Sequence, residues 1–411
     1  FDTGSTGFML VCTSLVMLMT PALAFFYGGL ATKRNILGIM SQSFFSLGWS
    51  TILWVVIGYS FCFSGNFADG TDFLGILGNF DKAFLQGITT SSLFPGNEKI
   101  PEFVFVAFQM MFAILTPALI TGAFVNRVTF KAYFIFLTAW QFLVYYPFAH
   151  MVWGGGILAE WGVLDFAGGI VVHATAGFAA LASVFFVGAR VDKNSTPNSI
   201  PLVAIGTGLL WFGWYGFNAG SQLLVDGVTA NAFLNTDIGA SFALITWLVI
   251  DLITKRTPSF VGMLTGSIAG LATITPTAGF IPIWSAPIVG ICAGAGCYIA
   301  VHFKNKKGWD DALDVWGVHG VGGVIGTILL GVFASTSVNP SGADGLIFGG
   351  GGFFLKETVS VLGASLYAFI FTYVLLWLIN KVTKVRVSEQ SELAGLDITL
   401  HGEKAYDEGV L

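Results

Sequence analysis

Long apolar runs separated by short polar segments recur along the whole chain. A helix rises about 1.5 Å per residue, so about 20 apolar residues cross a hydrocarbon core about 30 Å thick. The pattern predicts an all-α polytopic membrane protein with eleven membrane-spanning helices. They are expected near residues 7–31, 36–63, 103–125, 132–150, 165–189, 200–222, 231–253, 260–277, 282–303, 311–334 and 357–380. We therefore expect a membrane domain over residues 1–380 and a C-terminal tail over residues 381–411.

The composition agrees with this interpretation. The chain is 55% hydrophobic and only 10% charged, with a mean hydropathy of +0.79, whereas a soluble domain carries about 25% charged residues. Glycine is abundant, at 53 residues. Because small residues let membrane helices approach closely, this content favours a tight helical bundle.

The positions of the basic residues predict the orientation of the chain. Fifteen of the 18 Lys and Arg residues follow odd-numbered spans, and only Lys82, Lys99 and Lys356 fall on the other side. Since basic loops stay in the cytoplasm, the N-terminus is expected outside and the C-terminus inside. A missed helix would disturb this alternation, so it also supports the count of eleven.

Eleven spans can hold two five-helix halves plus one extra helix. Halves with an odd number of spans are inverted relative to each other, which is common in transporters. Spans five and ten are then counterparts: Asp165 lies eight residues before His173, and Asp311 lies eight residues before His319. Eight residues rise about 12 Å, so histidines that enter from opposite faces reach similar depths near the midplane. Their rings can touch there if the two spans cross.

An intramembrane histidine either satisfies a hydrogen bond between helices or lines a pathway. Ionisable side chains are rare in membrane spans and usually mark a pathway or relay, and the matched depth of His173 and His319 favours a functional pair. No acid or Cys lies three or four residues from either ring. Because zinc needs three or four ligands, no metal site is expected. His150, at the outer end of span four, is expected at the membrane interface.

Aromatic residues gather near the expected outer ends of spans three and six. Phe108 and Phe112 share one helix face, and Trp214, Phe217 and Ser221 share another. Trp153 follows span four at the outer surface. Aromatic faces attract cations by about 0.5–2 kcal/mol, and Ser221 can accept a hydrogen bond. Aromatic stripes also pack or form interfacial belts, and spacing alone favours packing.

Acidic residues flank both histidine-bearing spans. Asp165 is expected to cap span five through backbone N–H groups. Its negative charge near the outer cluster of aromatic residues favours the binding of a cation there. Asp310, Asp311 and Asp314 are expected to cap span ten and to shape the inner exit.

At these residues the sequence resembles the ammonium transporter family (Amt/Mep/Rh), and specifically its bacterial and archaeal Amt branch. The matching stretches run from the first span to the tail, so the resemblance covers essentially the whole chain. They are "FFYGGL" (25–30), "VAFQ" (106–109), "AHMVWGGG" (149–156), "LDFAGGIVVH" (164–173), "WYGFNAGS" (214–221), "DVWGVHGV" (314–321), and "GLD" with "HGEKAY" in 395–406.

The resemblance implies a homotrimer in a cell (inner or plasma) membrane, with a separate pore through each protomer. It implies an outer recruitment site for ammonium at Trp153, Ser221 and Phe112, flanked by Phe108. It further implies a phenyl gate of Phe112 and Phe217, a twin-histidine pair of His173 and His319, a pore-lining Trp214 and a buried Asp165. The inner face could receive a PII-type signal protein. Neither a cofactor nor a nucleic-acid partner is expected.

The mechanism expected from these residues is transport of ammonium, with methylammonium as an analogue. The cation loses water at the outer mouth and then meets a dry, narrow pore. Burial lowers the pKa of a cationic amine, so deprotonation near the gate is favoured, and ammonia then moves along the two histidines, with or without the proton. Potassium cannot give up a proton and should be rejected at the gate.

Two other classes of function remain as alternatives. One is an ammonium sensor, or transceptor, that signals through a cytoplasmic partner. The other is an intramembrane enzyme that uses the histidine pair, which is disfavoured because no nucleophile, metal set or paired acid accompanies the rings.

Overall fold

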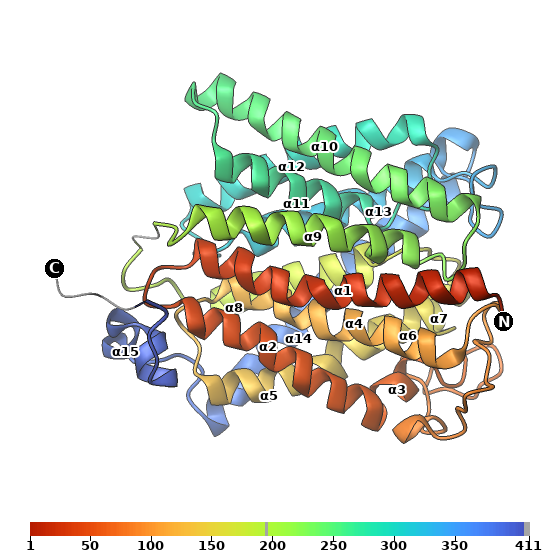
Figure 1. Ribbon diagram of the computed structural model, residues 1–411, viewed down its shortest axis with the longest axis horizontal. Coiled ribbons are helices and arrows are strands. Elements are labelled where there is room, and N and C mark those ends of the chain that lie inside the picture. The colour runs from red at the N-terminus through yellow and green to blue at the C-terminus, as the bar shows by residue number, and fades with distance from the viewer. Residues whose placement is uncertain (194–195, 407–411) are drawn as a thin grey trace.

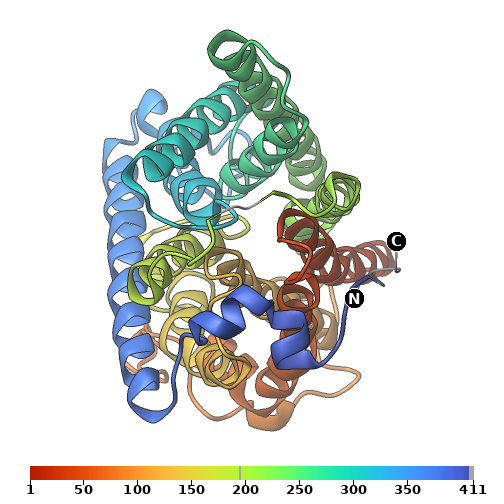
Figure 2. The same cartoon turned by 90° about the vertical axis from the view of Figure 1, so that its left-hand side faces the viewer.

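A computed structural model describes residues 1–193 and 196–406, and the regular structure of these residues is helical. The long helices lie side by side along the long axis of the molecule (Figure 1). The end-on view shows α10–α13 gathered in one group and α1–α6 in another, with α14 along one side of the bundle (Figure 2). The three extended pairings in the described residues are isolated β-bridges.

The first half of the chain supplies five spans. Their elements are α1 (Thr3–Leu30), α2 (Ile36–Leu53), η1 (Trp54–Gly58), α3 (Tyr59–Phe63), α4 (Glu102–Ile120), η3 (Thr121–Ala123), α5 (Phe130–Trp140), η4 (Gln141–Tyr145), α6 (Tyr146–Trp153), α7 (Ile157–Trp161), η5 (Gly169–Ala174) and α8 (Thr175–Val187). A long loop between α3 and α4 carries the short turn η2 (Ala83–Leu85).

The second half supplies five further spans, and one more helix precedes the tail. The elements are α9 (Ile200–Gly220), α10 (Gly227–Lys255), α11 (Phe260–Ile274), η6 (Ile283–Ser285), α12 (Ala286–Lys307), η7 (Trp316–Gly320), α13 (Val321–Phe333), η8 (Leu346–Phe348), α14 (Gly351–Val382), α15 (Glu389–Ala394) and η9 (Asp397–His401). Ten segments of the described chain are long and apolar enough to cross a membrane, and α11 is a shorter apolar helix. The prediction of an all-α protein with eleven spans is therefore confirmed.

Four spans contain a π-helical turn, at η1, η4, η5 and η7. Such turns are rare within α-helices and are frequent at functional sites. The hydropathy pattern did not predict them, because one extra residue in a turn leaves a uniformly apolar run unchanged. Two of the four turns contain the histidines of the expected pair, His173 in η5 and His319 in η7.

The fifth and tenth spans pack against each other reciprocally. The π-turn η5 contacts α13, while its counterpart η7 contacts α8, and the first and sixth spans, α1 and α9, also pack together. A two-fold relation between inverted halves produces this exchange of contacts.

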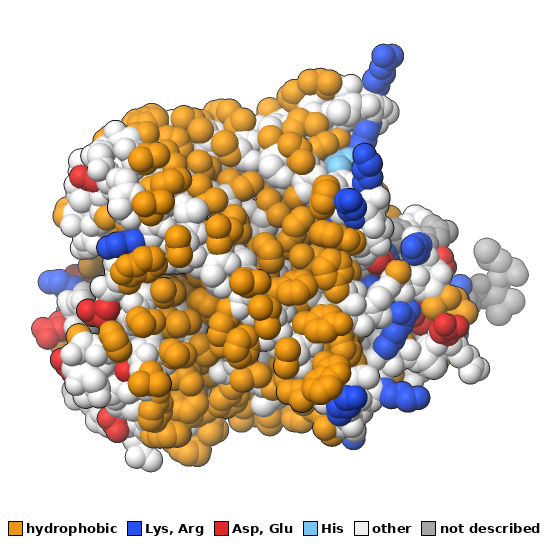
Figure 3. All heavy atoms as spheres, turned by 180° about the vertical axis from the view of Figure 1, so that it is seen from behind, with side chains coloured by type: hydrophobic (Ala, Val, Ile, Leu, Met, Phe, Trp, Pro, Cys, Tyr) orange, Lys and Arg blue, Asp and Glu red, His pale blue; other side chains and the backbone are white. Residues whose placement is uncertain are grey.

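Charged residues mark the two ends of the bundle. Lys and Arg side chains gather at the end where the C-terminal tail lies, and a belt of apolar side chains separates this tail end from the opposite end (Figure 3). The N-terminus lies at the end opposite α15 (Figure 1). Which end faces the cytoplasm stays a prediction from the basic residues.

The tail after α14 packs on the start of α2. The Asp397 carboxylate accepts hydrogen bonds from the backbone N–H groups of Ile36 (3.1 Å) and Gly38 (2.8 Å). Arg34 Nη1 donates to the Leu393 carbonyl at 3.0 Å. The tail thereby satisfies N–H groups that every helix start leaves without a partner.

Of the three acids expected to cap the tenth span, only one does so. Asp311 accepts from the N–H groups of Val315 and Trp316. Asp310 instead pairs with Arg190 at 2.7 Å and lies 3.6 Å from Arg127, and Asp314 pairs with Lys304 at 2.7 Å. The expectation was wrong for Asp310 and Asp314 because buried cations from other segments take their carboxylates.

The pair of Asp310 with Arg190 predicts a pH-dependent contribution to stability. Burial alone raises the pKa of Asp310, but hydrogen bonds from Arg190 and the charge of Arg127 lower it to about 2, below the unfolded value of about 3.9. The stabilisation is therefore complete only above about pH 5 and is lost as the pH falls towards 2.

We expect Asp310→Asn to lower the free energy of unfolding by on the order of 1–2 kcal/mol at pH 7 and to match the parent near pH 2. Thermal unfolding in detergent across this pH range measures the difference. Asp81→Asn, at an exposed loop acid, is the control and should change little. A constant difference between Asp310→Asn and the parent at all pH values would contradict the assignment.

Candidate functional site

The two histidines of spans five and ten meet inside the bundle. Nδ1 of His173 lies 3.2 Å from Nδ1 of His319, and the two rings meet edge to edge with centroids 5.2 Å apart and an interplanar angle of 19°. Both side chains are buried, at 1% and 4% exposure. The pair that the sequence placed at matched depth is thus in direct contact, although its role stays a proposal.

Glycines bring the two helix backbones close enough for this contact. A Cβ atom on Gly177, four residues after His173, would lie 2.1 Å from the backbone of Gly320. On the other side of the pseudo-two-fold, a Cβ on Gly323, four residues after His319, would lie 2.7 Å from the backbone nitrogen of Ala174. No side chain fits at either crossing point, so glycine is required at both for the rings to touch.

The contact between two Nδ1 atoms restricts the protons that the rings can carry. One Nδ1 must donate and the other must accept, because a neutral imidazole has one N–H and one acceptor nitrogen. The two rings therefore share a single proton along this line and cannot both be imidazolium in this geometry. The described residues contain no cluster of three or more His, Cys, Asp or Glu side chains that could hold a metal.

A column of aromatic rings leads from the histidines towards the end of the bundle opposite the tail. Trp214 and Phe217 lie 5.5 and 6.0 Å from His173, both stacked on its ring. Phe217 in turn lies 4.5 Å from Phe112. Phe112 and Phe217 come from α4 and α9 and are fully buried, at 1% and 0% exposure. These two phenyl rings close the path above the histidines.

Beyond the phenyl rings lies a hollow of about 240 Å³ that opens at the end opposite the tail. Its lining includes Phe112, Trp153 and Ser221, so three of the predicted mouth residues are brought together. The Ser221 hydroxyl donates to the Phe217 carbonyl at 2.8 Å. Its oxygen lone pairs remain available to accept a hydrogen bond. We refer to this hollow as the mouth.

Asp165 lies beneath the mouth and caps the fifth span. Its carboxylate accepts the backbone N–H groups of four successive residues, from Gly168 to Val171, at 2.7–3.1 Å. Its backbone carbonyl accepts the Trp153 indole N–H at 2.8 Å. The predicted cap is confirmed, and the same residue also fixes the tryptophan of the mouth.

Phe108 flanks the mouth from behind Phe112, with ring centroids 4.9 Å apart, and Gly220 approaches its ring closely. One expectation needs correction. His150 is not interfacial but fully buried, with Nε2 2.8 Å from Asp72 and Nδ1 2.9 Å from the Cys62 carbonyl. Sequence spacing gave no signal for this pairing, because Asp72 lies 78 residues away in a loop.

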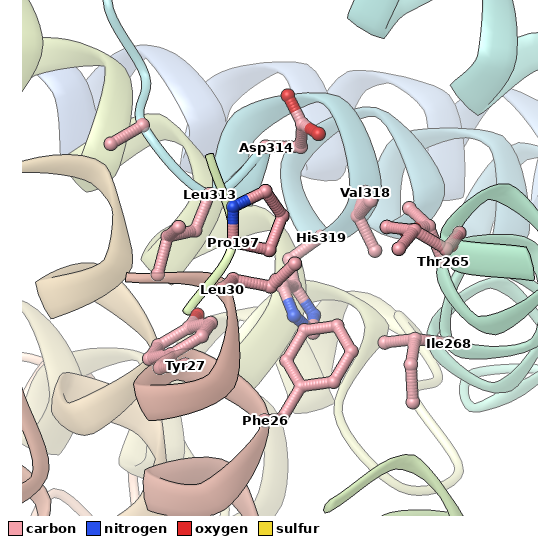
Figure 4. Close-up of a pocket in the computed structure, with 12 residues that line it drawn as sticks. Phe26, Tyr27, Leu30, Pro197, Thr265, Ile268, Leu313, Asp314, Val318 and His319 are labelled. Carbon is pink, nitrogen blue, oxygen red and sulfur yellow. The ribbon is translucent and has the colours of Figure 1, made fainter. Parts of the chain in front are cut away.

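A second hollow lies on the other side of the histidines, towards the tail end (Figure 4). Phe26 and Tyr27 of α1 line it together with Val318 and His319, and Asp314 stands at its edge. We refer to this second hollow as the vestibule. A narrow cavity between the vestibule and the phenyl rings is lined by both histidines and Trp214. Phe26 and Tyr27 belong to the motif "FFYGGL", but an apolar motif in a uniformly apolar span gives no sign that its rings line the path.

The mouth, the phenyl pair, the histidine cavity and the vestibule follow one another through a single bundle. Fold and site together define a multi-pass membrane protein of the transporter or channel class. A family model described as "Ammonium Transporter Family" matches residues 7–406. The chain belongs to this family, whose members are membrane transporters or channels rather than enzymes.

Curated relatives agree over the full length. An ammonium transporter of Bacillus subtilis is 42% identical over 412 residues, covering 99% of both chains. Ammonium transporter Amt1 of Archaeoglobus fulgidus is 41% identical over 98% of this chain and 99% of its own. The bacterial and archaeal resemblance is therefore confirmed.

Solved structures share the fold. The crystal structure of Saccharomyces cerevisiae Mep2 superposes with a TM-score of 0.89 at 34% identity, covering 100% of this chain and 93% of that one. A structure named "Sensor Amt Protein" gives a TM-score of 0.88 at 28% identity, covering 96% of this chain and 98% of its own.

The glycine crossing predicts a strong effect of a small substitution. Gly177→Ala places a methyl group against the Gly320 backbone, so the two spans must separate. We expect a loss of about 1–3 kcal/mol in stability and a longer distance between the His173 and His319 rings, measured by thermal unfolding and by structure determination of the variant.

Gly208→Ala is the matched control, because this helical glycine of α9 has no atom within 4 Å of an added Cβ. It should be neutral or slightly stabilising. If Gly177→Ala behaved in the same way as this control, the close crossing would not be what holds the rings together.

Proposed function

We propose that the protein transports ammonium by capturing the cation at the mouth and conducting ammonia past the two histidines. Trp153 and Phe112 supply aromatic faces for the cation, and Ser221 supplies an acceptor oxygen. Asp165 adds a negative charge beneath the site. Phe108 flanks it from behind Phe112 and gives its ring a firm support.

Loss of the proton is the step that selects ammonium. The mouth contains the polar side chains of Gln109 and Ser221, but the phenyl pair and the cavity beyond it are lined by apolar and aromatic side chains and the two histidines. An unpaired cation in such surroundings costs several kcal/mol or more, whereas neutral ammonia does not carry this cost. Phe112 and Phe217 therefore act as a gate that ammonia passes and potassium does not.

The observation that carries this proposal is the contact of 3.2 Å between the two Nδ1 atoms within a buried cavity. His173 Nε2 has no hydrogen-bond partner among the described residues, so it offers a hydrogen-bonding position to a small molecule. Ammonia both donates and accepts, and can replace the missing partner. The proton shared by the rings allows a relay in which a proton also crosses, while Trp214 keeps His173 in its orientation.

We further propose that the protein works as a homotrimer in a cell (inner or plasma) membrane. Residues 1–380 form the membrane domain and residues 381–411 a cytoplasmic tail that can report to a PII-type signal protein. The contacts of Asp397 and Arg34 between tail and bundle support such a coupling. A role as an ammonium sensor is the second candidate, and the likeness to a protein named as a sensor Amt favours it.

The decisive experiment is an ammonium-evoked current in liposomes that contain the purified protein, with potassium as the control ion. We expect a current or uptake with ammonium and none with potassium. His173→Ala and His319→Ala should each lower the uptake of methylammonium, or its selectivity over potassium, by a factor of at least about 100. This is the size of effect expected when a proton-transfer step is lost. Parental transport in both variants would end the relay hypothesis.

Trp153→Leu should weaken capture without blocking conduction. Removing the ring takes away about 0.5–1 kcal/mol of cation attraction, so the half-saturating ammonium concentration should rise several-fold while the maximal rate is kept. Uptake measured over a wide range of ammonium concentrations separates the two. An equal loss at every concentration would argue against a capture site.

A further inference from the structure

A buried acid–base pair lies behind the mouth and has no part in the path described above. His150, in the last turn of α6, is 0% exposed, and the side chain of Asp72, from the long loop between α3 and α4, is 1% exposed. Nε2 of His150 lies 2.8 Å from Asp72 Oδ2, and Nδ1 lies 2.9 Å from the Cys62 carbonyl at the end of α3. The ring thereby joins three separate segments.

The two contacts fix the number of protons in the pair. A carbonyl oxygen and an ionised carboxylate can only accept, whereas a neutral imidazole has a single N–H to give. Both contacts are made only if the pair holds one proton more than a neutral histidine and an ionised aspartate. The pair is then electrically neutral as a whole, either as imidazolium with carboxylate or as imidazole with carboxylic acid. It therefore holds the loop by hydrogen bonds and adds no net charge to the mouth.

The pair also fixes the turn that follows α6. The second oxygen of Asp72 accepts from the Gly75 N–H at 2.9 Å, and the Gly75 carbonyl accepts from the Ile157 N–H at 2.9 Å. Any side chain at Gly154 would collide with the Cys62 carbonyl, since its Cβ would lie 1.9 Å away. The loop and this turn are thus joined on both sides of His150.

Trp153 stands on the same helical turn as His150, three residues later. Its indole N–H is fixed from below by the Asp165 carbonyl at 2.8 Å, and its ring meets Phe112 at 6.0 Å. Its backbone lies between His150, which is held by Asp72 and Cys62, and Gly154, which packs tightly against the Cys62 carbonyl. We propose that His150 and Asp72 are positioning residues that keep Trp153 over the mouth and so set the affinity of capture. This inference rests on the proposed function.

The test uses substitutions that separate hydrogen bonding from charge. Asp72→Ser can still accept from the Gly75 N–H but is too short to reach His150. Asp72→Asn keeps both contacts, because its amide donates to Nε2 of a neutral ring and its oxygen accepts from Gly75. Asp69→Ser is the matched control, since Asp69 is an exposed acid of the same loop and its hydrogen bonds are made to Asn66 of that loop.

Ammonium-evoked currents in liposomes give the half-saturating concentration and the maximal rate. Asp72→Ser should raise the half-saturating concentration about fivefold, by an amount comparable to the loss of one cation–aromatic contact, and leave the maximal rate unchanged. Asp72→Asn and Asp69→Ser should match the parent. In a Trp153→Leu background, Asp72→Ser should have no further effect, because no indole ring is left for the pair to hold in place.

Three results would overturn the inference. They are a parental half-saturating concentration in Asp72→Ser, a rise of this concentration in Asp72→Asn equal to that in Asp72→Ser, and additive effects of Asp72→Ser and Trp153→Leu. If Asp72→Ser does not yield a monodisperse protein, His150→Asn takes its place with the same expectation, because its amide keeps the contact with Cys62 and gives up Asp72. An unchanged concentration in Trp153→Leu alone would overturn the capture site itself. A rise in Trp153→Leu beside a parental Asp72→Ser would overturn only the positioning pair.

Discussion

The close contact of two helix backbones at Gly177 and Gly320 is the constraint on which the interior depends. Imidazole rings are short, so they reach each other across a helix crossing only when nothing stands between the main chains. A second crossing at Gly323 and Ala174 repeats the arrangement with the halves exchanged. The histidine pair, the cavity around it and the rings stacked above it all follow from this geometry.

Irregular backbone inside a membrane has to be satisfied by the protein itself, because lipid offers no hydrogen bonds. The π-turns that carry His173 and His319 begin beside acids that answer this need. Asp165 takes four N–H groups and Asp311 takes two. Each acid satisfies the backbone of the turn that carries its histidine. This explains why the acid–histidine spacing is the same in both halves.

Much of this arrangement could be predicted from the sequence. Apolar runs and basic loops gave the spans, and the equal spacing from Asp165 to His173 and from Asp311 to His319 gave the meeting of the rings. Partners distant in sequence could not be predicted. The contact of His150 with Asp72, and the pairing of Asp310 and Asp314 with Arg190 and Lys304, depend on how loops fold back. Hydropathy carries no information on that folding, and motif spacing did not separate the support role of Phe108 from the lining role of Phe112.

The phenyl rings of Phe112 and Phe217, which are fully buried with their centroids 4.5 Å apart, close the path between the two sides. A narrow apolar constriction of this kind stays dry, and a broken water column cannot pass hydrated ions or let protons hop along it. Many copies of such a sealed bundle could therefore stand in one membrane without short-circuiting the voltage across it.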